Sequence, residues 1–152
     1  MGLDGKVCSG IIDTEGGIVM GKRVRSHRDL VVWQRGIEFA VWVYRATDGF
    51  PKQEVYGLTD QIRRAAVSIP ANIAEGQGRR TDGAFAHYLD IALGSAAELD
   101  THLQIALQLN YLSKQEHQDL LAELTEITKM LHGLYRTVSK HIPNRQRPTS
   151  KA

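Results

Sequence analysis

Four long segments of the sequence place apolar residues three and four positions apart, and short turns connect them. This spacing puts apolar side chains on one face of an α-helix. The turn between the first two segments reads GFPKQ and the turn between the last two reads NYLS, so the helices of each pair must run antiparallel. The sequence therefore predicts an all-α fold, an up-down-up-down antiparallel four-helix bundle.

Capping residues and turn sequences predict the limits of these helices. Asp29 is a suitable N-cap for the first, and the sequence DGFP stops it. Ser113 and Glu116 have the spacing of a capping box at the start of the fourth. The predicted helices run from Asp29 to about Thr47, from about Glu54 to Gln77, from Thr81 past Ala106, and from Ser113 to Val138.

The first predicted helix is apolar over more of its circumference than the third that a bundle core requires. One set of its residues is predicted to face the core, namely Leu30, Trp33, Ile37, Ala40, Val41 and Tyr44. An adjoining set is expected to contact a second copy of the chain, together with residues opposite the core positions of the second helix. The expected interface consists of Val32, Phe39, Trp42, Val43, Val67, Ala71 and Ala74. For the second helix alone, a plain solvated face is the alternative.

Pro70 lies near the middle of the second predicted helix, in QIRRAAVSIPANIAEGQGRR. A proline there removes a backbone hydrogen bond and costs roughly 3 kcal/mol. Ser68 and Asn72 can bond the freed backbone groups, so we expect one long helix bent near Pro70. The alternative is a break at Ile69 and a new helix that begins at Pro70.

Gly76 and Gly78 are expected to end this helix, because glycine adopts the left-handed conformation at low cost. Their pattern, GQG, does not predict a phosphate-binding loop. Such a loop follows a strand and opens a helix.

Basic charge is concentrated at the two ends of the chain. The net charge is +2, yet residues 31–138 hold thirteen acids against ten Lys and Arg. Residues 1–27 are rich in glycine and lack periodicity, so we expect a flexible, poorly ordered extension, in which Met20 is a candidate start of the natural chain. Residues 28–140 are predicted to form the bundle domain and 141–152 a basic tail. Such tails contact polyanions or act only as solubilising ends.

The remaining composition is that of a cytoplasmic protein. Cys8 is the single cysteine and permits no internal disulfide. No apolar run approaches the roughly 20 residues that span a bilayer, so we expect no contact with a membrane.

No group of residues in the sequence predicts catalysis or metal binding. Di-iron bundles use paired Glu-x-x-His motifs, and this sequence has none. Glu98 with His102 and His87 with Asp90 lie one turn apart, mostly off the core, and are expected as surface pairs. Cys8 has no defined base nearby. We therefore predict that the protein is not an enzyme and has no catalytic residues, no metal and no cofactor.

Three segments within about residues 28–138 read DLVVWQRGIEFAVWVYRAT, FPKQEVYGLTDQIRRAAVSIPANIAEGQGRR and YLDIALGSAAELDTHL. Together they resemble the 23S rRNA intervening-sequence protein family, whose members are also called four-helix bundle proteins. This family is similar to the accessory proteins of bacterial diversity-generating retroelements, pentameric barrels that work with a reverse transcriptase and its RNA. The resemblance implies a homo-oligomer, a pentamer, with a nucleic-acid-associated role. Residues 1–26 depart from the pattern, as does Gly83-Ala84, where the family usually has a charged residue.

The arginines of the sequence suggest how such a role would be carried out. We expect electrostatic binding of RNA or DNA, without readout of base sequence, through arginines on the outside of the bundle. The candidates are Arg25, Arg28, Arg35, Arg63, Arg64, Arg79 and Arg80. The alternative is a module that assembles with another protein, such as a polymerase, and does not bind nucleic acid itself.

Overall fold

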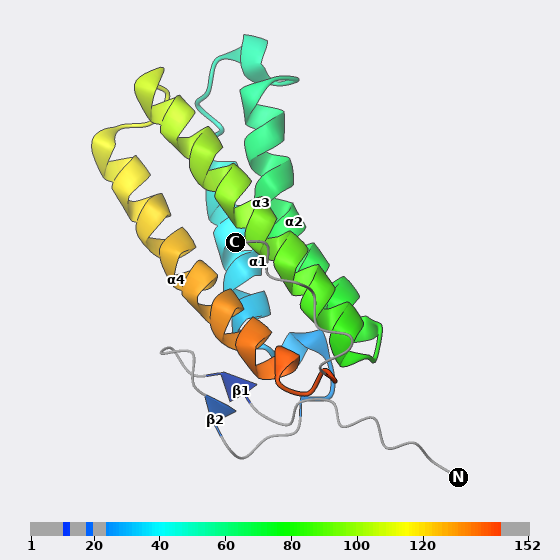
Figure 1. The fold of residues 1–152 in the computed structure, drawn as a ribbon. Helices are drawn as coiled ribbons and strands as arrows, with labels where there is room; N and C mark the ends of the chain where they lie inside the picture. Colours follow the sequence, from blue (N-terminus) through cyan, green and yellow to red (C-terminus); the bar gives the residue numbers. More distant parts are fainter. Residues whose placement is uncertain (1–10, 13–17, 20–23, 144–152) are drawn as a thin grey trace.

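Four antiparallel α-helices pack in up-down-up-down order in the computed structural model, which describes residues 11–12, 18–19 and 24–143 (Figure 1). The predicted four-helix bundle is confirmed. The other residues of the predicted extension, Met20 among them, and the predicted tail from residue 144 lie outside the described residues. The helices are α1 (Val31–Ala46), α2 (Leu58–Gly78), α3 (Asp82–Gln108) and α4 (Lys114–Ser139).

Short elements precede the first two helices. The 3-10 helices η1 (His27–Asp29) and η2 (Lys52–Glu54) lead into α1 and α2. Strands β1 (Ile11–Ile12) and β2 (Ile18–Val19) pair antiparallel near the end of the bundle where α4 finishes (Figure 1).

Side-chain caps start three of the helical elements. The Glu116 carboxylate accepts from the backbone N–H of Ser113 at 2.7 Å, and the Ser113 hydroxyl accepts from the N–H of Glu116 at 3.1 Å. The first of these bonds favours the ionised carboxylate and lowers the pKa of Glu116. Thr81 caps α3. Ser26 is the N-cap of η1, and Asp29 completes its capping box, because the Asp29 carboxylate accepts from the N–H groups of residues 25 and 26. The prediction that Asp29 is the N-cap of the first long helix is therefore wrong.

The helices follow one another around the bundle, with the most extensive contact between α2 and α3 and the least between α4 and α1. The pair α1–α2 therefore lies opposite the pair α3–α4. Packing extends past both predicted limits of the domain, residues 28 and 140, because Val24 and Ile142 are buried. Leu134 and Val138, near the C-terminal end of α4, are buried as well.

α1 turns a different face to the core from the one predicted. Val32, Phe39 and Val43 are 1%, 1% and 0% exposed, so the prediction that they contact a second copy is wrong. Ile37 and Val41, predicted as core residues, are 40% and 45% exposed.

A close approach between α1 and α2 explains which face of α1 is buried. Gly36 lies on the same side of α1 as Phe39 and Val43, and a Cβ atom on Gly36 would lie 3.3 Å from the Cβ of Pro70. The missing side chain lets α2 dock against this side. Both the buried face of α1 and the face with Ile37 and Val41 are apolar, so hydrophobic spacing alone does not show which one packs into the core.

α2 runs without a break through Pro70, as predicted, and the alternative break at Ile69 is wrong. The Asn72 side-chain amide donates to the carbonyl and the hydroxyl of Ser68 at 2.8 and 2.9 Å. The hydroxyls of Ser68 and Ser95 are 2.8 Å apart, which links the proline turn to α3. These bonds and the packing of α3 hold the segment in place despite the proline.

The end of α2 differs from the prediction in one respect. Gly76 lies inside the helix, buried against α3, and a Cβ atom there would lie 2.6 Å from the Cβ of Tyr88. Gly78 is the last residue of the helix, as expected. Arg80 adopts the left-handed conformation instead of a glycine, with φ of 62°.

Candidate functional site

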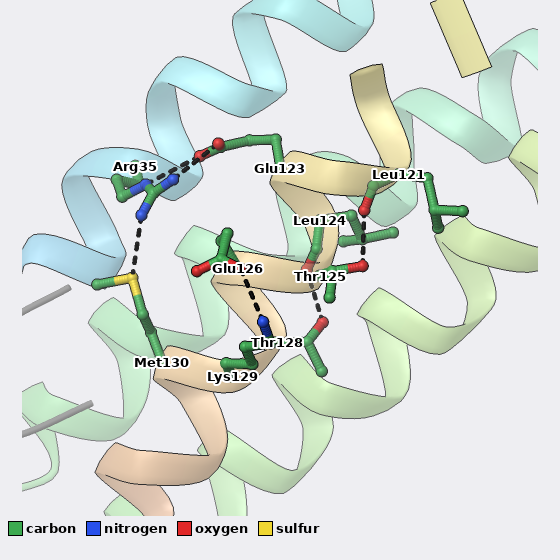
Figure 2. A network of polar contacts seen from close by, with 9 residues as sticks. All are labelled: Arg35, Leu121, Glu123, Leu124, Thr125, Glu126, Thr128, Lys129 and Met130. Atoms are coloured by element: carbon green, nitrogen blue, oxygen red, sulfur yellow. Dashed lines mark hydrogen bonds and ion pairs between the residues drawn. The ribbon is translucent and has the colours of Figure 1, made fainter. Parts of the chain in front are cut away.

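Arg35 is bound within the bundle and is not the exposed cation that the sequence suggests. Its guanidinium donates two hydrogen bonds to the Glu123 carboxylate, at 2.9 and 2.7 Å, and a third to the Met130 sulfur at 3.7 Å (Figure 2). The bonds to Glu123 raise the pKa of Arg35. A bidentate pair of this kind fixes α1 against α4, and Arg35 cannot contact a phosphate without losing it.

Arg63 is also engaged, between α1 and α2. Its Nε donates to the Thr47 hydroxyl at 2.9 Å, and its guanidinium lies over the Tyr44 ring at 4.7 Å and pairs with Asp48 at 3.2 Å. Arg64, one residue on, points outward with its side chain 80% exposed, and its distance of 3.9 Å to Asp60 makes only a weak surface pair.

Four of the seven predicted arginines remain exposed at one end of the bundle. Arg25 and Arg28 precede α1, and η1 packs against α2. Arg79 and Arg80 form the turn from α2 to α3, at the same end (Figure 1).

The C-terminal turn of α4 completes this group of cations. α4 finishes at the same end, so it brings the exposed Arg136 and Lys140 to it (Figure 1). Sequence reasoning left Arg136 out, although the antiparallel order of the helices places the end of the fourth beside the start of the first. We call the six residues the basic end: Arg25, Arg28, Arg79, Arg80, Arg136 and Lys140.

Aromatic rings and acids modulate the charge of the basic end. Arg28 lies over the Trp33 ring at 5.5 Å and Arg79 over the Tyr88 ring at 5.6 Å. Arg79 also pairs with Glu75, and that hydrogen bond raises the pKa of the arginine. Arg80 makes no ion pair with any described residue, so its charge is fully available to a ligand.

A second surface carries exposed apolar side chains along the junction of α1 and α2. Ile37, Val41 and Tyr44 follow helical spacing on α1, and the Tyr44 ring contacts Arg63 of α2. Val67 and Ala71 lie one and two turns after Arg63 and are exposed as well. We call this surface the α1–α2 flank and define it as Ile37, Val41, Tyr44, Val67 and Ala71.

The structure separates the remaining predicted interface residues. Ala74 is half-buried, one turn after Ala71 on α2. Trp42 is exposed on the other side of α1, beside Arg35 and Glu123, in a hollow of about 310 Å³. Trp42 therefore cannot share one flat contact surface with Val67.

No catalytic arrangement appears among the described residues. Glu98 and His102 pair at 3.3 Å, but only the Glu98 side chain is exposed, and that of His102 is largely buried. No described group of three or more His, Cys, Asp or Glu could hold a metal ion. Across residues 11–12, 18–19 and 24–143, no helix is both long and apolar enough to cross a membrane.

Comparison with known proteins identifies the family. The profile of the family described as 23S rRNA-intervening sequence protein matches residues 28–133. No curated protein matches the chain. Among solved structures, the chain is similar to a protein of unknown function from the S23 ribosomal protein family of Bacteroides thetaiotaomicron, at 28% identity and a TM-score of 0.65. The match covers 70% of this chain and 96% of that one. The four-helix chain described above belongs to the 23S rRNA-intervening sequence protein family.

Proposed function

We propose that the protein is a non-enzymatic, cytoplasmic homo-oligomer that binds RNA or DNA through the charge of its basic end, as an accessory of a ribonucleoprotein. The observation that carries the proposal is that six exposed cations lie at one end of the bundle. They come from the segment before α1, from the α2–α3 turn and from the C-terminal turn of α4. The family name and the ribosomal-protein family of the structural neighbour support an RNA-related role.

Electrostatic contact with phosphates explains why the proposed binding depends on charge and not on base sequence. A phosphate backbone offers repeated negative charge, and each neutralising Lys or Arg releases a counterion. Such contacts position a nucleic acid and carry no base sequence information. In an oligomer the basic end is repeated, so weak contacts by single copies add up to a multivalent surface.

The proposal predicts a matched difference between two double variants. Arg28→Ala/Arg80→Ala removes two charges from the basic end, and Lys52→Ala/Lys114→Ala removes two exposed charges from the opposite end. We expect the first to weaken binding of a labelled RNA hairpin and to lower the slope of log K against log salt by about two. The second should leave both unchanged. Fluorescence anisotropy between about 50 and 200 mM salt provides the measurement.

Two outcomes of this experiment would contradict nucleic-acid binding at the basic end. One is absence of binding by the natural sequence at the lowest salt. The other is an equal loss of affinity in both double variants, since binding would then follow net charge and not one surface.

The oligomer is proposed from the α1–α2 flank. Apolar side chains that are 40% or more exposed, such as Val41 and Val67, follow one another across two adjacent helices. Contiguous apolar surface of this kind is typical of interaction sites. Five copies is the number that the family resemblance implies.

A charge on the α1–α2 flank is expected to dissociate the oligomer without unfolding the bundle. Val67→Glu places a carboxylate in the proposed contact, where burying it unpaired costs more than the 1.4 kcal/mol that corresponds to about a tenfold change in affinity. Gln61→Glu, an exposed position elsewhere on α2, is the matched control. Light scattering should report a smaller particle for Val67→Glu only. An unchanged mass for that variant would exclude the α1–α2 flank as an interface.

The alternative function, a protein-assembly module without nucleic-acid binding, is favoured by one observation. At the end opposite the basic end, Tyr56 is 95% exposed and Val55 beside it is half exposed. These side chains would suit a protein partner of the polymerase type. Salt-independent recovery of one purified partner, lost in Tyr56→Ala and unaffected by nuclease, would support this function over the first.

A further inference from the structure

A groove between α3 and α4, on the side of the bundle opposite the α1–α2 flank, has the shape and charge to receive another helix pair. Its volume is about 670 Å³. Gly94 lines its α3 wall, and a Cβ atom added there would meet nothing within 4 Å. Ala97 continues this low wall, and Leu121 and Thr125 form part of the α4 wall.

The two threonines of the α4 wall can be covered by an apolar partner without losing the hydrogen bonds that their hydroxyls donate. The Thr125 and Thr128 hydroxyls donate to the carbonyls of Leu121 and Leu124, each at 2.8 Å (Figure 2). Lys129 pairs with Glu126 at 2.9 Å, and this bond lowers the pKa of Glu126. Covering the two threonines therefore costs little in lost hydrogen bonds to water, whereas Lys129 and His132, which also line the groove and are exposed, require polar or charged neighbours.

The α3 wall carries negative charge that is unbalanced within the described part of the chain. Asp90 and Asp100 line the groove, and neither forms an ion pair with a described residue. A neutral partner that covered the groove would bury these carboxylates without a counter-charge. A partner with cations beside an apolar stripe would pair with them.

The α1–α2 flank has this complementary character. Arg45 lies one turn after Val41, is exposed and makes no ion pair with a described residue. Arg64 lies one turn before Val67, with only the weak pair to Asp60. Two arginines therefore border an apolar stripe on one side of the bundle, and two aspartates border an apolar groove on the opposite side.

We infer that the α1–α2 flank of one copy docks into the α3–α4 groove of the next, so that the oligomer is built head to tail. This inference rests on the proposed self-association and specifies its partner surfaces. A contact between two different surfaces of the same chain generates a closed ring when the rotation closes, whereas contact of one surface with itself stops at a dimer.

Cross-linking between different positions tests the arrangement. In a Cys8→Ser background, Val41→Cys and Ala97→Cys each place one thiol, on the α1–α2 flank and in the groove respectively. With a short bis-maleimide linker, we expect covalent dimers when the two variants are mixed, and none from either variant alone. A Val41→Cys dimer formed without its partner variant would overturn the inference, because the flank would then contact itself.

Light scattering on the same samples distinguishes failure of the inference from failure of the proposed assembly. An oligomer that gives no cross-link in the mixture overturns the head-to-tail contact and leaves self-association standing. A monomer at all concentrations overturns both.

Charge reversal gives a second test that does not depend on thiol geometry. Asp90→Lys/Asp100→Lys and Arg45→Glu/Arg64→Glu should each fail to assemble, because like charges then face each other across the contact. Combined in one chain, the four substitutions should restore assembly, since glutamates then meet lysines at every contact of the ring. A fourfold variant that stays dissociated, like the two double variants, would contradict the inference.

Discussion

Phe39→Ala is expected to lower the free energy of unfolding by about 3–5 kcal/mol. The Phe39 ring is fully buried and meets the Trp42 ring edge-on, with centroids 6.1 Å apart. Truncation removes apolar surface from the core and leaves a cavity that the surrounding helices cannot fully close. Urea denaturation followed by circular dichroism at 222 nm, a helix signal, measures the change.

Ile37→Ala, two residues earlier in the same helix, is the control for this experiment. Ile37 is 40% exposed in the single chain, so we expect a loss below about 1 kcal/mol under conditions where the protein is monomeric. The comparison must be made at low protein concentration, because association adds stability that depends on concentration. Equal losses in the two variants would mean that α1 buries the other stripe.

Gly76→Ala is expected to destabilise the bundle by about 1–3 kcal/mol, although alanine is the better helix former. The new methyl group would lie 2.6 Å from the Cβ of Tyr88 and 3.0 Å from the Phe85 ring, so α2 and α3 would have to move apart. Thermal unfolding should show a lower Tm.

Gly78→Ala provides a control of opposite sign. A Cβ atom on Gly78 would meet nothing within 4 Å, so only the helix preference of alanine operates, up to about 1 kcal/mol in favour of the fold. A stabilising effect of Gly76→Ala would show that the two helices do not approach as closely as described.

The sequence predicted those features that depend on local chemistry. The four helices, the capping box of Ser113 with Glu116 and the unbroken path of α2 through Pro70 all follow from neighbouring residues, and all are confirmed. The family was predicted as well, from three segments inside the region 28–133 that the family profile covers.

Features that depend on a choice between equivalent contacts were not predictable. Both faces of α1 are apolar, and the close approach of Gly36 to Pro70 favours burial of the face that holds Phe39 and Val43. Arg35 has the same sequence character as an exposed arginine, and Glu123, 88 positions away, determines that it is bound. Long-range pairs of this kind require the relative rotation of two helices, which hydrophobic spacing does not report.

The burial of Val24 and Ile142 has a practical consequence for anyone who shortens this chain. A fragment cut to the matched region, 28–133, would lose both of these side chains, and with them Leu134 and Val138. The last hydrophobic layer of the bundle would then open to water at the end that carries the arginines. We therefore expect the fragment 28–133 to be less stable than a chain that keeps residues 24–142.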